Sequence, residues 1–135
     1  MERERLQIGI DIGSTTTKIV AVNQDTDEIT YSDYRRHSAQ QVQSVIDCLK
    51  RLKERFPAAE LRMALTGSGA KKLADLLGLS YVQEVVANSI AIRKLYKEVR
   101  TAIELGGQDA KVLFFRKDDK TGRLDVADMR MNGSC

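Results

Sequence analysis

Residues 8–22 read Ile8-Gly-Ile-Asp-Ile-Gly-Ser-Thr-Thr-Thr-Lys-Ile-Val-Ala-Val22, and this stretch decides the fold. The alternating isoleucines at its start predict a strand, and the β-branched run from Ile19 predicts the strand that follows. Between them, Gly13 permits a tight turn because it has no Cβ. Hydroxyl side chains and closely spaced backbone N–H groups occupy the rest of the turn. The stretch therefore predicts a β-hairpin whose turn forms a concave site for a phosphate.

The same hairpin supplies the charged groups that a nucleotide phosphate requires. Asp11, at the end of the first strand, is expected to hold Mg²⁺ through water, because a hard cation prefers oxygen ligands. Lys18 adds a positive charge. An ordinary hairpin with a threonine-rich polar turn is the alternative interpretation. The residues predicted to bind phosphate here are Gly13, Ser14, Thr15, Thr16 and Lys18.

The spacing from Gly13 to Lys18 resembles a nucleotide P-loop only in part. The second glycine of G-x-x-x-x-G-K-[ST] is missing, and Ile19 stands where Ser or Thr should follow the lysine. A strand is also predicted where a P-loop would continue into a helix. We therefore expect a phosphate-binding hairpin and not a P-loop.

The composition excludes several classes of function. With 135 residues, the chain is long enough for a domain with a hydrophobic core. Its 22 Lys and Arg against 19 Asp and Glu give a net charge of +3, too even to indicate binding to nucleic acid or to an anionic membrane. It has no Trp, which argues against a platform for stacking bases, and no apolar run approaches the length of a membrane helix. Cys48 and Cys135 do not form a disulfide framework and fit a reducing cytoplasm.

Between residues 28 and 100 the pattern predicts strands that alternate with helices. A third strand covers 28–36, and a helix over 39–56 follows it, with Ser38 as its N-cap. Next come a strand over 61–65, a glycine turn at 66–69 and a helix over 70–77. A short strand at 80–82 and a helix over 84–100 complete this part of the chain. The helical residues expected in the core are Val42, Val45, Ile46, Leu49, Leu52, Phe56, Leu73, Leu76, Leu77, Val86, Ile90, Leu95 and Val99.

The opening pattern then restarts roughly a hundred residues further on. A strand over 101–105 leads into the turn Gly106-Gly-Gln-Asp109, and two more strands follow at 110–115 and 124–131. Both ends of the chain thus hold a strand, a turn with Gly and Asp, and two further strands, which indicates a weak internal duplication. The second copy stops where its first helix should begin. We therefore expect the sequence to be an N-terminal fragment of a longer protein.

Two such turns are expected to hold one nucleotide in a cleft between two similar domains. The first hairpin would contact the β-phosphate region and the second the γ-phosphate, through Gly106, Gly107 and Gln108. Asp11 and Asp109 would act as the catalytic residues. They would hold Mg²⁺ through water and orient the attacking water. Phosphoryl transfer needs little more than this positioning and charge neutralisation.

The segments 11–18 and 103–111 resemble the two phosphate motifs of the superfamily that joins actin, sugar and acetate kinases and heat-shock chaperone ATPases. More narrowly, the chain resembles the BadF/BadG/BcrA/BcrD ATPase family, the activases of 2-hydroxyacyl-CoA dehydratases and benzoyl-CoA reductases. The segments that fit its long-chain branch, in which activase modules are fused to further domains, are 31–38, 66–69, 82–85 and 130–135. The resemblance implies an α/β, ribonuclease H-like fold. One complete β-β-β-α-β-α-β-α domain would cover 1–100, and the first three-strand meander of a second would cover 101–135.

The resemblance also implies a mechanism for the intact protein. A homodimer would bind MgATP in each subunit and carry one [4Fe-4S] cluster, with two cysteines from each subunit. ATP hydrolysis would drive a low-potential electron from the cluster to an acyl-CoA dehydratase or reductase partner. Cys135 matches the first cluster cysteine, and the second would lie beyond this chain. The fragment by itself is therefore expected to lack the cluster and full ATPase activity.

Two other functions fit the same fold, a small-molecule kinase and a non-enzymatic, nucleotide-gated binding module. All three predict MgATP binding, but only the activase predicts iron. Among the remaining polar residues, His37 is expected at a surface strand end and Cys48 as a packing or surface thiol. Lys111 either touches phosphate or is solvated, and Glu84 either complements the start of its helix or points into a cleft.

Overall fold

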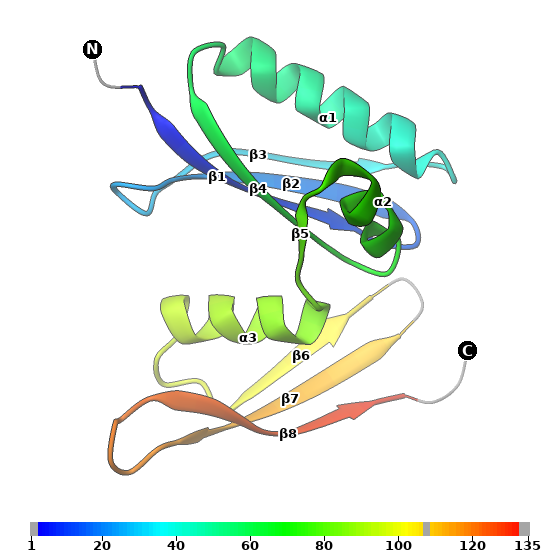
Figure 1. Ribbon diagram of the computed structural model, residues 1–135. Coiled ribbons are helices and arrows are strands. Elements are labelled where there is room, and N and C mark those ends of the chain that lie inside the picture. The colour runs from blue at the N-terminus through cyan, green and yellow to red at the C-terminus, as the bar shows by residue number, and fades with distance from the viewer. Residues whose placement is uncertain (1–2, 107–108, 133–135) are drawn as a thin grey trace. The chain divides into compact units, whose positions relative to one another are not determined.

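The computed structural model describes residues 3–106 and 109–132. The chain divides into two compact units, Met1–Val82 and Gln83–Cys135, which Figure 1 shows as ribbons. Its elements follow one another as β-β-β-α-β-α-β-α and then β-β-β, which is the predicted order. This division into two units reflects packing alone. The predicted domain boundary after residue 100 refers instead to the repeating unit of the fold, so it stays a prediction.

The first unit is a mixed five-stranded sheet of order β3-β2-β1-β4-β5 with two helices. The opening meander is antiparallel, β4 runs parallel to β1, and β5 runs parallel to β4. The elements are β1 Arg5–Ile12, β2 Thr16–Asn23, β3 Ile29–Arg36, α1 Gln41–Arg55, β4 Glu60–Thr66, α2 Ala70–Leu77 and β5 Ser80–Tyr81.

The core of the first unit lies on one face of β1. Residues 6, 8, 10 and 12 are all at most 2% exposed, as the alternation of isoleucines predicted. They belong to one buried cluster with Val45, Cys48 and Leu52 of α1 and with Ala70 and Ala74 of α2. Both helices therefore contribute to the core on that face. Asp11 alternates with these residues and so lies on the opposite face of β1.

The start of α1 differs from the prediction. Its N-cap is Gln40 rather than Ser38, and no side chain caps the helix. Ser38 and Ala39 instead adopt left-handed backbone conformations, with φ of 46° and 65°. These two residues reverse the chain between β3 and α1, so that the hydroxyl of Ser38 does not cap the helix.

Several predicted core residues of these two helices are exposed. Val42 is 57% exposed and Leu76 is 75% exposed, and Ile46 and Leu77 are also exposed. In α1, the buried face follows Val45, Cys48 and Leu52, so that the other apolar residues lie on its flanks. In α2, two small alanines make the close contact, Leu73 packs beside them, and Leu76 and Leu77 turn outward. Periodicity predicted both helices and part of their buried faces, since Val45 and Leu52 are buried and Leu49, Phe56 and Leu73 pack against the core.

The second unit consists of one helix and a three-stranded antiparallel sheet of order β6-β7-β8. Its core is Leu113, Phe115 and Leu124, packed against apolar residues that include Val85, Ile92 and Val99. The elements are α3 Glu84–Leu95, β6 Thr101–Leu105, β7 Ala110–Lys117 and β8 Leu124–Met131.

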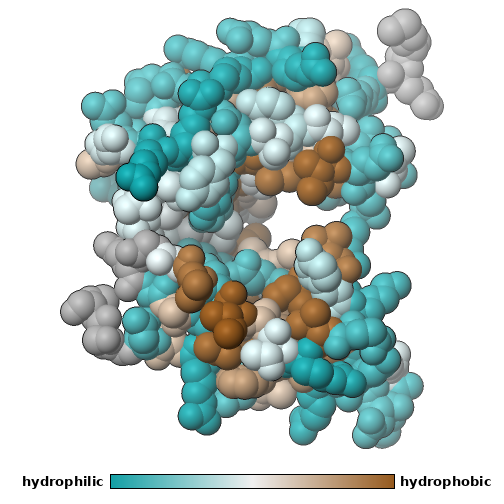
Figure 2. All heavy atoms as spheres, turned by 180° about the vertical axis from the view of Figure 1, so that it is seen from behind, coloured by the Kyte–Doolittle hydropathy of each residue, from teal (hydrophilic) through white to brown (hydrophobic). Residues whose placement is uncertain are grey.

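The helix of this unit is shorter and less buried than predicted. It ends at Leu95 instead of near residue 100. Val86, Ile90 and Leu95, predicted in the core, are 43%, 50% and 64% exposed, because the three-stranded sheet covers only one side of the helix. Figure 2 shows exposed hydrophobic side chains in brown on this unit. No helix within the described ranges is long and apolar enough to cross a membrane.

The two meanders share one register, which confirms the predicted duplication. Asp11 faces Lys18 across β1 and β2, and Glu104 faces Lys111 across β6 and β7. Each residue of the second pair lies 93 positions after its counterpart in the first. The same offset separates the residues whose hydrogen bond closes each turn, which are Gly13 and Thr16 in the first hairpin and Gly106 and Asp109 in the second. It also separates the register shifts, which begin at Ala21 and at Phe114.

Candidate functional site

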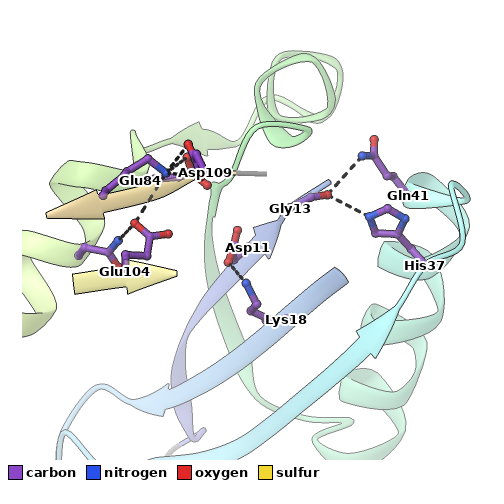
Figure 3. Close-up of polar contacts among 10 residues, drawn as sticks. Asp11, Gly13, Lys18, His37, Gln41, Glu84, Glu104 and Asp109 are labelled. Carbon is purple, nitrogen blue, oxygen red and sulfur yellow. Dashed lines mark hydrogen bonds and ion pairs between the residues drawn. The ribbon is translucent and has the colours of Figure 1, made fainter. Parts of the chain in front are cut away.

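The first hairpin brings its acidic and basic residues into contact. Lys18 Nζ lies 2.6 Å from Asp11 Oδ2, and the two side chains are 40% and 30% exposed (Figure 3). The same ammonium group lies 5.9 Å from the centre of the Tyr34 ring. Lys18, predicted as a phosphate contact, therefore also neutralises part of the charge of Asp11.

The second carboxylate oxygen of Asp11 is buried without a partner. Within the part of the chain that the structure describes, neither Asp11 Oδ1 nor Thr66 Oγ1 makes a hydrogen bond, although both atoms are buried. Asp11 and Thr66 are neighbours in the parallel register of β1 and β4, so their side chains leave the same face of the sheet. Buried polar atoms without partners are rare and indicate a missing water, ion or ligand.

Gly67 makes room for this carboxylate. It has a φ of +100°, and a Cβ built there would lie 2.5 Å from Asp11 Oδ1 and 2.4 Å from the carbonyl oxygen of Ile12. The backbone therefore approaches Asp11 as closely as only glycine allows. A carboxylate and a hydroxyl oxygen side by side are the kind of donors that suit Mg²⁺ or its bound water.

The β1–β2 turn exposes backbone N–H groups and buries one of its predicted side chains. Gly13 N–H donates to Thr16 O at 2.9 Å, and the Thr16 side chain is only 8% exposed. Among the described residues, no hydrogen bond is donated by the backbone N–H of Ser14 or Thr15. These two N–H groups are therefore the ones in the turn that remain available to a phosphate.

His37 lies against this turn and not at the surface. It is 5% exposed, and its Nε2 lies 2.9 Å from Gly13 O. Gln41 Nε2 approaches the same oxygen at 3.4 Å, as Figure 3 shows. The expectation of a surface histidine was wrong, because the chain turns inward directly after β3.

The second hairpin surrounds one buried lysine with three carboxylates. Lys111 is 6% exposed, and its Nζ lies 3.3 Å from Glu84, 3.7 Å from Glu104 and 3.2 Å from Asp109. Figure 3 labels these three acidic residues. The expectation that Lys111 could be a solvated lysine was wrong. In this unit Glu84 points toward Lys111.

The charges of this cluster affect the lysine. Burial lowers the pKa of Lys111, but the hydrogen bond that Lys111 donates to Asp109 and the charges of Glu104 and Glu84 outweigh it, so that the pKa is raised above its ordinary value of 10.5. Glu104 also accepts a hydrogen bond from Asn88 Nδ2 at 2.8 Å. Lys111 thus holds Asp109 and two further carboxylates in place.

We expect the Lys111→Met variant to lose about 2 kcal/mol of unfolding free energy at neutral pH. A fully buried pair would lose more, but Glu84 and Asp109 are 30% and 34% exposed. Because the folded-state pKa of Lys111 is raised, its contribution is complete below 10.5 and is lost as the pH rises through the folded pKa. The difference from wild type, measured by urea unfolding, should therefore shrink above that pH.

Lys117→Met is the matched control for this prediction. Lys117 lies on the same strand and pairs at 3.5 Å with Glu98, but the two side chains are 43% and 81% exposed. An exposed pair contributes roughly 0–1 kcal/mol. Equal losses in the two variants, or a Lys111→Met loss that does not change with pH, would contradict the role assigned to Lys111.

Gly106 repeats the close approach seen at Gly67. Its N–H donates to Asp109 O at 2.8 Å, and a Cβ built on it would lie 2.9 Å from Asp109 Oδ1. The predicted phosphate contacts Gly107 and Gln108, and the predicted cluster ligand Cys135, lie outside the described residues.

The sequence did not single out Glu104 and Thr66 as site residues. The 93-residue offset identifies Glu104 as the counterpart of Asp11. Aligning Lys18 with Lys111 in the sequence would have revealed this correspondence. Thr66 was marked only as part of the glycine turn at 66–69, because its place beside Asp11 depends on the parallel pairing of β4 with β1.

The described residues provide no ready-made metal cluster. Within residues 3–106 and 109–132, no group of three or more His, Cys, Asp and Glu side chains could by itself hold a metal ion. Cys48 is fully buried, and burial raises the pKa of its thiol. It is therefore a packing residue, one of the two roles expected for it.

Comparisons with known sequences match almost the whole chain. The sequence model of the BadF/BadG/BcrA/BcrD ATPase family matches residues 8–135. An uncharacterized protein of Methanocaldococcus jannaschii is 30% identical over 132 residues, which are 95% of this chain and 49% of that protein. The chain thus spans about half the length of this curated relative.

Solved structures show the same fold. The activator of 2-hydroxyisocaproyl-CoA dehydratase from Clostridium difficile, solved with bound ADPNP, is 26% identical with a TM-score of 0.74, over 96% of this chain and 46% of that one. Component A of (R)-2-hydroxyglutaryl-CoA dehydratase from Acidaminococcus fermentans is 23% identical with a TM-score of 0.69, over 96% and 48%. The predicted actin-like, ribonuclease H-like fold class is therefore confirmed.

Proposed function

The chain belongs to the BadF/BadG/BcrA/BcrD ATPase family, and on that premise we propose that it is the ATP-binding part of a dehydratase or reductase activator. In the whole protein, ATP hydrolysis would drive an electron from a [4Fe-4S] cluster to an acyl-CoA dehydratase or reductase. The similarity to the Clostridium difficile activator, whose structure holds ADPNP, supports this proposal. The homodimer and the cluster are parts of the proposal that rest on the family resemblance.

The observation that carries the nucleotide assignment is the buried oxygen of Asp11 that has no partner in residues 3–106 and 109–132. Its second oxygen is held by Lys18, so that the carboxylate is fixed in orientation while Oδ1 stays available. Thr66 Oγ1 lies in register beside it and is equally unpartnered among the described residues. Bound Mg²⁺ would supply charge neutralisation for the phosphates.

The chain's own residues would perform two tasks. In the first unit, the turn from Gly13 to Thr16 would bind phosphate oxygens through backbone N–H groups, and Asp11 would hold the water shell of the metal. In the second unit, Lys111 would hold Asp109 in a fixed orientation through their 3.2 Å contact. A fixed carboxylate can orient a water for in-line attack without a costly rearrangement at the moment of reaction.

The cluster proposal is tested by measuring iron in the full-length protein, purified without oxygen, beside its Cys135→Ala variant. We expect about four irons per dimer and a broad visible absorption band in the wild type, and the loss of both in the variant. Cys48→Ala is the matched control, because Cys48 is buried in the first unit's core and should not affect iron content.

The alternative outcome has a clear meaning. If neither protein holds iron but both hydrolyse ATP, the activase proposal is wrong and Cys135 has a structural role. A kinase or a nucleotide-gated binding module would then be the function of this fold, and phosphorylation of candidate small molecules would be measured next.

A further inference from the structure

We propose that His37 is a positioning residue that holds the β1–β2 turn in its phosphate-binding conformation. The inference rests on the proposed function, because the turn is the phosphate site assigned there. It adds a residue from a different segment, the connection between β3 and α1, which no sequence motif marked as part of the site.

His37 makes two hydrogen bonds to the turn, one from its side chain and one from its backbone. The imidazole Nε2 lies 2.9 Å from Gly13 O, and the backbone N–H donates to Thr15 O at 3.1 Å. Figure 3 shows the ring of His37 directed at Gly13, beside the side chain of Gln41. Two carbonyl groups of the turn are thereby fixed by one residue.

The chemistry of these contacts determines the tautomer. A carbonyl oxygen only accepts hydrogen bonds, so Nε2 of His37 must carry the proton and donate it. In the neutral ring the other nitrogen, Nδ1, is then an acceptor, and it is buried with no partner within the residues that the structure describes. A buried acceptor without a partner is unfavourable, and an apolar side chain of similar size would avoid it. The imidazole is therefore explained by the hydrogen bond that it donates and not by packing.

Fixing these carbonyl groups orients the neighbouring N–H groups. Each peptide unit is planar, so a carbonyl directed at His37 directs the N–H of the same unit away from it. The units concerned are Gly13–Ser14 and Thr15–Thr16, and the N–H of Ser14 has no acceptor among the described residues. The Ser14 N–H is therefore directed away from His37 and stays available to an anion.

The backbone next to His37 is strained in a way that serves this contact. Ser38 and Ala39 have φ of 46° and 65°, which is unfavourable for residues with a Cβ. Gln40 N–H donates to His37 O at 2.7 Å and closes this reversal. Strain of this kind persists only where surrounding contacts enforce it, and it often marks functional positions. Here it turns the imidazole inward to reach Gly13.

The test compares His37→Gln with His37→Met. Glutamine places an N–H donor close to the position of Nε2, whereas methionine fills the space without a donor. Two quantities are measured on the full chain, the exchange rate of the Gly13 amide hydrogen without nucleotide and the affinity for MgATP with a fluorescent analogue. We expect His37→Met to exchange faster and bind about tenfold more weakly, the effect of one lost hydrogen bond. We expect His37→Gln to restore both.

A purely structural role would give a different result. The amide of Leu79, which donates to Ala74 O at 2.9 Å at the end of α2, is the internal control and should exchange at the wild-type rate in both variants. Equal acceleration at Gly13 and Leu79, or a glutamine variant as weak as the methionine variant, would overturn the inference. If the exchange pattern holds but wild type binds no MgATP, the positioning of the turn is supported and the nucleotide assignment is the part that fails.

Discussion

Replacing Asp11 with alanine is expected to reduce the kcat for ATP hydrolysis by the full-length protein at least about 100-fold, the usual effect of removing one electrostatic contact to the reacting phosphate. The same change is expected to leave the free energy of unfolding nearly unchanged. The ion pair with Lys18 is partly exposed and contributes little. The buried Oδ1 atom, which has no partner among the described residues, is a cost that alanine removes.

This combination separates a functional carboxylate from a structural one. ATPase rate and urea unfolding are measured on Asp11→Ala and on Asp75→Ala as the control. Asp75 forms an exposed pair with Lys71 on α2, and its removal should alter neither quantity. Wild-type turnover in Asp11→Ala would contradict a role of Asp11 in hydrolysis. A variant that loses activity only because it is largely unfolded would contradict it too.

The sequence predicted the strands well because their patterns are local. The alternation at residues 8, 10 and 12 needs no knowledge of the partner strand, and the structure buries all three residues. The helical cores were predicted less well for the same reason. Which side of α1 faces the sheet depends on the sheet, so that Val45 and Leu52 are buried whereas Val42 is exposed. A helix with apolar residues on several faces leaves that choice to tertiary packing.

The candidate site divides in the same way. Asp11, Gly13 and Lys18 follow one another along a hairpin, so their proximity could be predicted from their spacing. Thr66 lies on β4, and only the pairing of β4 with β1 brings it to the hairpin. His37 lies in the β3–α1 connection, and the strained reversal after it brings it there. Contacts between segments distant in sequence leave no local pattern, which is why these residues were missed.

The duplication connects the two hairpins chemically as well as in register. Each carries an acidic residue on its first strand and a lysine opposite it on the second, Asp11 with Lys18 and Glu104 with Lys111. The first pair is partly exposed and leaves one carboxylate oxygen without a partner among the described residues, whereas the second lysine is buried among three carboxylates. The same arrangement of strands and charges therefore produces a different local environment in each unit.

Gly67→Ala is expected to destabilise the chain by about 3 kcal/mol or more. Two effects add at this position. An alanine with a φ of +100° is strained by its own backbone, and its Cβ would lie 2.4 Å from Ile12 O and 2.5 Å from Asp11 Oδ1. Because the nearest atom belongs to the backbone of β1, relief requires moving a central strand, which is costly in a packed core. Chemical denaturation of the full chain measures the loss.

Two further glycines separate these effects. Gly78 also has a positive φ, +64°, but a Cβ there would meet nothing within 4 Å, so Gly78→Ala measures backbone strain alone, about 1 kcal/mol. Gly9 lies in β1 with open space and no positive φ, and its replacement by alanine should cost nothing. The excess of Gly67→Ala over Gly78→Ala is then the cost of the contact with β1 and Asp11. An excess near zero would mean that β4 does not press against the carboxylate of Asp11, and the oxygen-lined site built from β1 and β4 would lose its main geometric support.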